Sequence, residues 1–164
     1  MASPQAADKF AVNNKVDIWN VDGDYTTAAI TTSVSTTGEV WLDMKGYSGL
    51  WVGVIGTNLT GTGPSALSIV GDESSTGATG NVVIATSSDS AVTGEGGYLT
   101  LEITAEQMKQ EGLDNATAYD LRYAAVKLTM NHANDEATVV AVRYGPRFAR
   151  DGLTAGSAAN STIS

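Results

Sequence analysis

Few residues of this chain have types and spacings that could support catalysis. Its 164 residues include one histidine and no cysteine, so the chain offers at most one imidazole base. His132 and Asp135 lie in one short polar stretch, and with one of the many serines they would supply the parts of a hydrolytic triad. No Gly-x-Ser-x-Gly motif accompanies them. We therefore favour a solvated turn here over the active site of a small hydrolase.

Acidic residues in two loops could bind calcium, which is held by carboxylate and carbonyl oxygens. Asp22 and Asp24 flank a glycine, and Asp72 and Glu73 lie in a second loop. Calcium needs about six to eight oxygen ligands, more than either turn offers alone. The absence of cysteine also excludes thiolate zinc sites and disulfide bonds. The sequence predicts neither a bound metal nor a cofactor.

Two further kinds of candidate lie on strand-like segments. Glycoside hydrolysis needs two carboxylates that face one cleft, and the strand-like segments carry Glu39, Asp43 and Glu102. Sugar binding by stacking needs exposed aromatic rings, and the three tryptophans fall on strand-like segments at Trp19, Trp41 and Trp51. Burial or interface packing is the commoner role of tryptophan. A lectin-like, carbohydrate-binding module is therefore an alternative that we keep open.

The most unusual segment is a basic stretch near the C-terminus, RYGPRFAR at residues 143–150. Residues 1–121 contain no arginine and have a net charge of −11, whereas residues 122–164 hold all four arginines and have a net charge of +2. Arginine and aromatic residues are enriched at protein interfaces. We predict a protein interface formed by Arg143, Tyr144, Arg147, Phe148 and Arg150. A salt-bridged strand end is the alternative.

Charge and hydropathy narrow the choice of partners. The net charge of −9 argues against nucleic-acid binding, which relies on a basic surface. No run of about 18 apolar residues is present, so we expect no membrane span. Residues 1–8 have neither a basic start nor an apolar run, so we expect no secretory signal.

Short alternating segments predict a mainly β protein. Strands are predicted at residues 16–21, 25–34, 39–44, 50–55, 66–70, 81–86, 98–103, 119–130 and 136–144. The second and third should form a hairpin, and the last two a hairpin through residues 131–135. A change of phase at Ala124–Ala125 suggests a bulge there, with a helix as the rival interpretation of that segment. The nearly all-apolar run at residues 50–55 suits a central strand covered on both faces, or a strand at an interface.

One short helix is predicted at residues 105–111. Thr104 and Gln107 fit a capping box, Ile103 and Met108 fit a hydrophobic staple, and Gly112 should end the helix. The resulting fold class is an antiparallel β-sandwich, jelly-roll-like, with one short helix. We expect an N-terminal arm at residues 1–14, a β-sandwich domain at 15–151 and a C-terminal arm at 152–164.

The segments LRYAAVKLTM at 121–130 and RYGPRFARDGL at 143–153 resemble small virion proteins of tailed bacteriophages. So does the composition, in which Ala, Gly, Ser and Thr supply 74 of the 164 residues. The resemblance implies a non-enzymatic capsid decoration or cement protein. Such a protein is made in the bacterial cytoplasm, is often a homotrimer, and binds the major capsid protein on the capsid exterior, with neither nucleic acid nor membrane as a partner. A phage tail or spike component is a further alternative.

Overall fold

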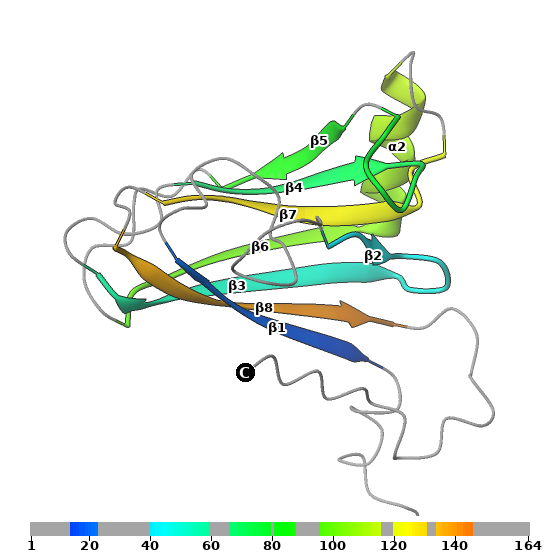
Figure 1. The fold of residues 1–164 in the computed structure, drawn as a ribbon. Coiled ribbons are helices and arrows are strands. Elements are labelled where there is room, and N and C mark those ends of the chain that lie inside the picture. Colours follow the sequence, from blue (N-terminus) through cyan, green and yellow to red (C-terminus); the bar gives the residue numbers. More distant parts are fainter. Residues whose placement is uncertain are drawn as a thin grey trace, which may run out of the picture.

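The computed structural model describes residues 14–22, 40–59, 66–79, 81–87, 96–115, 120–130 and 134–145, and every structural statement below concerns these residues (Figure 1). They form two antiparallel four-stranded sheets that pack face to face as two layers. The first sheet contains, in spatial order, β1 (Lys15–Asp22), β8 (Glu136–Tyr144), β3 (Gly49–Asn58) and β6 (Tyr98–Thr104). The second contains β2 (Leu42–Asp43), β7 (Tyr123–Thr129), β4 (Ala66–Asp72) and β5 (Val82–Thr86).

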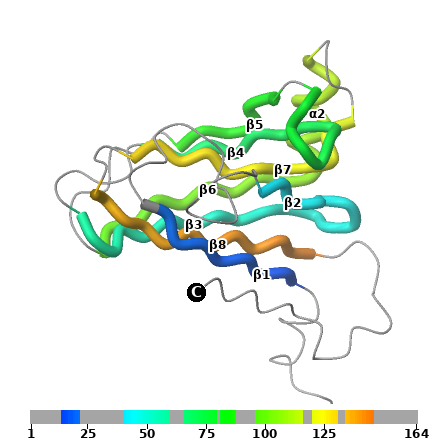
Figure 2. Tube along the Cα trace, viewed as in Figure 1, coloured from blue at the N-terminus to red at the C-terminus, as the bar shows by residue number. Residues whose placement is uncertain are grey.

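The two strand orders, β1-β8-β3-β6 and β2-β7-β4-β5, identify the fold as a jelly roll. Strands that follow one another in sequence mostly lie in opposite sheets, so the chain passes repeatedly from one layer to the other (Figure 2). The predicted β-sandwich with jelly-roll character is confirmed. The start of β1 and the end of β8 lie at the same end of the first sheet, because Lys15 of β1 pairs with Arg143 of β8.

The core lies between the two layers. Because successive side chains of a strand point to opposite faces, every second residue of each strand is directed inward. The inward positions are the ones the sequence fills with branched aliphatic residues. The most deeply buried of the large side chains include Leu50, Val52, Val54, Leu67, Ile69, Ile103, Met108, Val126, Leu128 and Val139. These side chains join the two sheets into one continuous core.

The helix, α2 (Ala105–Asp114), follows β6 and contacts β5 and β6 at the end of the sandwich where β8 also ends (Figure 1). The predicted capping box is present: the Gln107 amide donates to Thr104 Oγ1 at 3.1 Å, and the Thr104 amide donates to Gln107 Oε1 at 2.7 Å. The predicted stop at Gly112 is wrong. Gly112 is buried within the helix, and we attribute this to its packing outweighing a propensity cost of about 1 kcal/mol.

Two predictions about β7 are wrong. β7 and β8 do not form a hairpin, because β7 lies in the second sheet and β8 in the first. No bulge interrupts β7, which pairs with β4 in continuous register from Tyr123 to Thr129. The change of phase has another cause: Ala125 points away from the core but is buried beside Val70, with the Trp41 indole packed against both. A hydrophobic residue is therefore needed on both faces of β7 at this point.

Other predicted elements differ in extent or lie outside the described residues. The strand predicted at residues 50–55 is longer in the structure, where β3 runs from Gly49 to Asn58. Only Leu42–Asp43 of the strand predicted at residues 39–44 is extended, and it pairs with β7. The strand predicted at residues 25–34, residues 1–13 of the N-terminal arm, the whole C-terminal arm and residues 131–133 lie outside the described residues.

Candidate interaction surface

The face of the β1-β8-β3-β6 sheet that points away from β2-β7-β4-β5, hereafter the outer face, carries an unusual number of apolar residues. Its outward-pointing residues form rows across the four strands because of the strand register. The three central rows are Val16–Val142–Trp51–Glu102, Ile18–Val140–Gly53–Thr100 and Asn20–Thr138–Ile55–Tyr98. A water-facing sheet usually alternates apolar and polar residues, but here both sides of β1, β3 and β8 are largely apolar.

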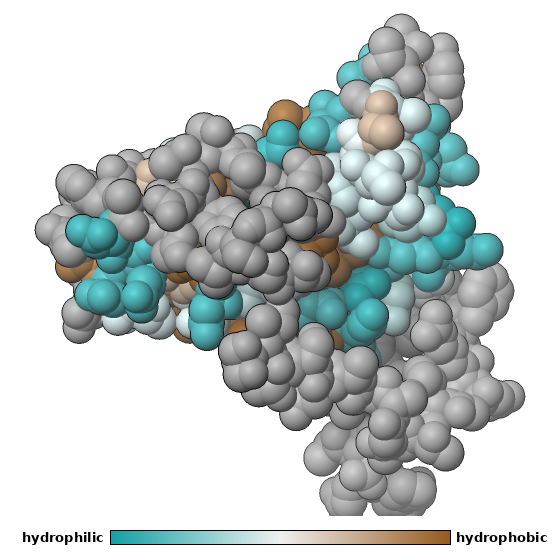
Figure 3. Space-filling model, viewed as in Figure 1, coloured by the Kyte–Doolittle hydropathy of each residue, from teal (hydrophilic) through white to brown (hydrophobic). Residues whose placement is uncertain are grey.

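Several side chains of the outer face are exposed to solvent. Ile18 is 52% exposed, Ile55 is 43% exposed and Tyr98 is 71% exposed. In the side view of Figure 3, hydrophilic residues lie at both ends of the described surface and also along its lower middle. Contiguous exposed apolar residues on a sheet mark a site of interaction with a protein or another ligand. The outer face is therefore our candidate functional site.

A hollow of about 400 Å³ lies at one end of the outer face, lined by Asn14, Trp51, Glu102, Val142 and Tyr144. The surface that it exposes is almost entirely apolar. The Trp51 indole lies along its own strand over Gly53, where a β-carbon would come within 2.4 Å of the Trp51 ring. Gly53 therefore makes room for Trp51, and Trp51 forms part of the hollow.

Tyr144 and Glu102 form a hydrogen bond beside the hollow, in which the phenol donates to Glu102 Oε1 at 2.5 Å. Burial of the phenol, together with this bond, raises the pKa of Tyr144 to about 12. The phenol is therefore protonated at neutral pH and acts as a donor. The phenol and the carboxylate oxygen Oε1 use their hydrogen-bonding capacity on each other, so the wall of the hollow is apolar rather than polar.

Arg143, the first residue of the predicted interface, is buried inside the domain. Its Nη2 donates to Asp17 Oδ2 at 2.8 Å and its Nη1 donates to the Asp43 carbonyl oxygen at 2.9 Å. The guanidinium carbon lies 5.4 Å from the centre of the Tyr47 ring, within range of a cation–π interaction. The structure thus gives Arg143 the salt-bridged position that the sequence left as an alternative, and a role for it in an interface stays a prediction.

The other predicted interface residues divide between two situations. Tyr144 is half-buried at the edge of the hollow, whereas Arg147, Phe148 and Arg150 lie outside the described residues. The chain leaves β8 at a well-anchored point: Ser48 donates its amide to the Tyr144 carbonyl at 2.9 Å and its hydroxyl to the Gly145 carbonyl at 2.5 Å. The basic stretch therefore continues from a fixed corner of the sandwich.

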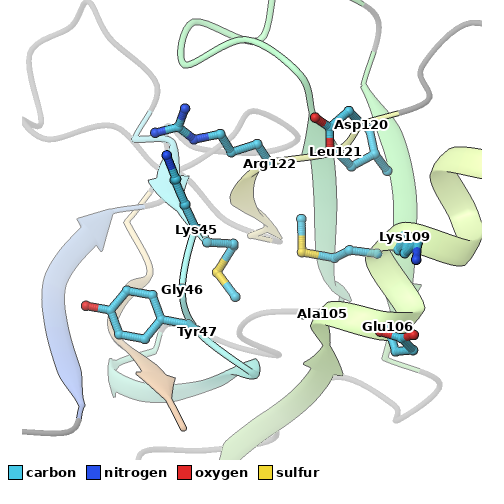
Figure 4. Close-up of a pocket in the computed structure, with 11 residues that line it drawn as sticks. Lys45, Gly46, Tyr47, Ala105, Glu106, Lys109, Asp120, Leu121 and Arg122 are labelled. Carbon is cyan, nitrogen blue, oxygen red and sulfur yellow. The ribbon is translucent and has the colours of Figure 1, made fainter. Parts of the chain in front are cut away.

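A second cavity, of about 550 Å³, lies between the segment before β3, the start of α2 and residues 120–122 (Figure 4). Lys45 and Arg122 extend along one side of it, and Lys109 and Glu106 lie on the helix at the opposite side. Arg122 Nη2 contacts Asp43 Oδ2 at 2.6 Å, and this bond holds the pKa of the Asp43 carboxyl below its ordinary value. With charges of both signs around its rim, this cavity favours no particular class of ligand.

The candidates for sugar binding and glycoside hydrolysis are dispersed by the fold. Trp19 belongs to the core, Trp41 packs on the outside of the second sheet, and Trp51 lies on the outer face. The three indoles therefore do not form one row. Asp43 and Glu102 belong to different sheets, where Arg122 and Tyr144 respectively are their partners, and Glu39 lies outside the described residues.

The loop candidates for calcium binding and for a triad are not assembled either. Asp72 is buried and accepts hydrogen bonds from the Ser74 amide at 2.7 Å and from the hydroxyl of Thr79, so it organises its own loop. Asp22 ends β1, whereas Asp24 and His132 lie outside the described residues. In the described part of the chain, no three acidic, histidine or cysteine residues are grouped so that they could hold a metal ion.

Sequence reasoning missed the outer face because it did not decide which side of β1 was inward. The alternation of β1 places Val16 and Ile18 on one face and Trp19 and Val21 on the other, and it is Trp19 and Val21 that the structure buries in the core. A strand that is apolar in both phases signals cover on both sides. The run at residues 50–55 carried this signal, and its outward residues Trp51 and Ile55 now belong to the outer face.

No helix within the described ranges is long and apolar enough to cross a bilayer. No protein-family model matches the chain, and no curated protein matches it in sequence. The fold and the outer face are therefore the observations on which a function must be argued.

Proposed function

We propose that this chain is a non-enzymatic structural protein of a bacteriophage virion that binds the major capsid protein on the capsid exterior and stabilises the shell. The observation that carries the proposal is that β1 begins beside the point where β8 ends. Lys15 pairs with Arg143, so the described part of the chain starts and stops at one corner of the jelly roll. The likeness of residues 121–130 and 143–153 to phage virion proteins supports the same function.

Two chain segments at one corner give a small domain a means of reaching across a junction between capsid subunits. Ordering a residue costs about 1–2 kcal/mol of backbone entropy, and apolar contact returns about 25 cal/mol per Å². The small side chains of residues 152–164 lose little rotamer freedom when they are ordered. Backbone hydrogen bonds to a neighbouring protein, together with a few anchoring side chains, would therefore suffice to bind the segment. Arg147, Phe148 and Arg150 are the anchors we propose, because arginine and aromatic residues supply much of the energy of protein interfaces.

Arg143 has a different part in this proposal. Its bonds to Asp17 and to the Asp43 carbonyl hold the end of β8 against the neighbouring strands. The residues that follow therefore start from a fixed position, which lowers the entropy lost on binding. A homotrimer, which the resemblance implies, would present three such corners and gain avidity at a symmetric capsid site.

The direct test is co-sedimentation of the purified protein with capsids of the virus that encodes it. Deletion of residues 152–164, or combined replacement of Arg147, Phe148 and Arg150 by alanine, should weaken binding at least about tenfold while the melting temperature of the domain is unchanged. Arg122→Ala is the matched control, since it removes an exposed arginine elsewhere. Unchanged binding by both altered proteins would reject the proposal for these anchors. Wild-type protein that stays in the supernatant would reject capsid binding itself.

The second candidate, carbohydrate binding, is favoured by one observation, the Trp51 hollow, and jelly rolls include lectins. A sugar site also needs several convergent polar groups. In the hollow, the Tyr144 hydroxyl already bonds Glu102, which weakens this candidate. Titration of oligosaccharides against tryptophan fluorescence of the wild type and of Trp51→Phe tests it. Quenching that depends on Trp51 would favour a lectin, and no response across a broad glycan panel would exclude it.

A further inference from the structure

Two glycines of β3 make room for the aromatic rings around the Trp51 hollow. A β-carbon at Gly53 would collide with the Trp51 ring, and a β-carbon at Gly49 would collide with the phenol of Tyr144. Tyr144 is opposite Gly49 on the neighbouring strand β8, so its ring crosses β3 to reach Glu102 on β6. The backbone of one strand therefore fixes both rings that border the hollow.

The charges of the outer face are acidic in the described part of the chain. Glu102 borders the hollow, and Glu136 is exposed at the start of β8. Lys15 and Arg143 are the basic residues of this sheet, but their register places them on the opposite side, where Arg143 bonds the Asp43 carbonyl. The other described lysines and arginines belong to the second sheet, to α2 or to connecting segments. A positively charged ligand is therefore matched to the outer face.

The hollow offers three contacts that suit an arginine side chain. Its nearly apolar surface suits an aliphatic stem, its aromatic rings attract a cation, and the carboxylate at its edge can accept N–H donors. Arginine fits better than lysine, because a planar guanidinium stacks on an aromatic ring and also donates two parallel hydrogen bonds to a carboxylate. The volume of about 400 Å³ is near the lower limit for binding sites, so one side chain is a suitable occupant.

We propose that the Trp51 hollow binds an arginine side chain of a partner protein, with the stem against Val142 and the guanidinium between the aromatic rings and the Glu102 carboxylate. The Tyr144 phenol bonds Oε1 of Glu102. This bond takes one of about four acceptor positions of the carboxylate, so it holds Glu102 in place and leaves positions for the guanidinium. That the partner is the major capsid protein rests on the proposed function, whereas the chemistry of the hollow does not.

The first test is an NMR titration of the full chain with arginine blocked at both backbone ends, without capsids. The probe is raised to a concentration on the order of 10 mM, because a single side chain binds weakly. We expect a saturable shift of the Trp51 indole N–H signal, which the Trp51→Leu spectrum identifies by its loss. Blocked citrulline, the neutral analogue of the same length, and blocked lysine are the control probes. No saturable shift with arginine, or equal affinity for either control probe, would overturn the proposal.

Glu102→Gln tests the part of the carboxylate. Glutamine retains an oxygen that can accept the Tyr144 phenol but has no charge, so the dissociation constant for blocked arginine should rise at least about fivefold. Glu136→Gln is the matched control, since it removes an exposed acid at the other end of the same sheet. Circular dichroism should show that both variants fold. Equal affinities of the two variants would overturn the site.

The chain's own basic stretch is the competing occupant, and a variant with Arg147→Ala and Arg150→Ala tests it. If blocked arginine binds the wild type and this variant equally, the hollow is open to a partner, as proposed. If arginine binds only the variant, the chain's own arginines fill the hollow, and the proposal is overturned.

Co-sedimentation with capsids tests the source of the arginine. Glu102→Gln should bind capsids at least about fivefold more weakly than Glu136→Gln. Equal capsid binding by the two variants would overturn the capsid protein as the source. Wild-type protein that binds blocked arginine but no capsids would reject the proposed function, while the arginine site itself would stand.

Discussion

Replacement of Arg143 by methionine should destabilise the fold strongly, although the sequence places this residue in a basic stretch of apparent surface character. Methionine retains most of the aliphatic volume but removes the bond to Asp17, the bond to the Asp43 carbonyl and the contact with the Tyr47 ring. The side chains of Arg143 and Asp17 are only 5% and 19% exposed. Their separation would leave a largely desolvated carboxylate without its cation.

The size of the effect follows from these contacts. Breaking a buried ion pair by removing one partner costs about 3–5 kcal/mol. The remaining exposure of Asp17, and an Arg143 Nε that has no hydrogen-bond partner among the described residues, place the estimate near the lower limit. We expect a loss of about 3 kcal/mol, which for a protein of this size lowers the melting temperature by about 6–12 °C.

Thermal and urea unfolding of Arg143→Met, followed by circular dichroism, measures this loss. Arg122→Met is the matched control, because Arg122 also bonds an aspartate, Asp43, but both side chains are about two-fifths exposed. Exposed ion pairs are screened by solvent and stabilise little, so this variant should melt close to the wild type. If Arg143→Met melts within 2 °C of the wild type, or if the two variants lose equal stability, the argument from burial is wrong.

Three further predictions concern single contacts. The pKa of Tyr144 is raised from 10.0 to about 12. The protonated phenol therefore contributes its full stabilisation of the fold below pH 10 and loses it as the pH rises through 12. Unfolding measured across this range should show the loss of stability in the wild type but not in Tyr144→Phe. Gly77→Ala should destabilise the fold by about 1–3 kcal/mol, because Gly77 has φ +67° and an added β-carbon would meet the Trp41 indole at 2.4 Å. Gly46 has φ +85° but open space around it, so Gly46→Ala should destabilise the fold less. Urea unfolding of the two variants measures the difference. Thr104→Ala removes the cap of α2 and should cost about 1 kcal/mol in calorimetry, and no measurable change would contradict the capping assignment.

The strands and the helix start were predictable because local signals agreed with the final fold. The predicted strand at residues 136–144 matches β8 residue for residue, and the capping box at Thr104 fixes where α2 begins. In each case the signal lies within the segment itself, as an alternation of apolar residues in β8 and as the Thr104–Gln107 cap of α2. Such features need no knowledge of distant contacts.

Predictions failed where distant residues decide the outcome. Ala125 reads as a change of phase in the sequence, but it is buried by Trp41, which lies more than 80 residues away. The segment between β7 and β8 predicts a hairpin from its sequence, but in the jelly roll the two strands belong to different sheets. Arg143 reads as a surface residue, but Asp17 and the Asp43 carbonyl, both far away in sequence, surround it.

The outer face illustrates the same limit for function. The apolar run at residues 50–55 predicts cover on both sides, but only the folded sheet shows that Ile18, Ile55 and Tyr98 lie on one surface. The predicted contact residues Arg147, Phe148 and Arg150 lie outside the described residues, so their part in an interface stays a prediction.

The measurement that tests the proposed function most directly is a saturation titration of the purified chain onto capsids of the encoding virus from which it has been removed. A capsid decoration protein fills a fixed set of symmetric sites. The bound amount should therefore reach a plateau at a constant ratio to the major capsid protein, and the filled capsids should resist heat better than bare ones. Binding that fails to saturate, or saturated capsids with unchanged heat resistance, would contradict the proposal that the chain stabilises the shell.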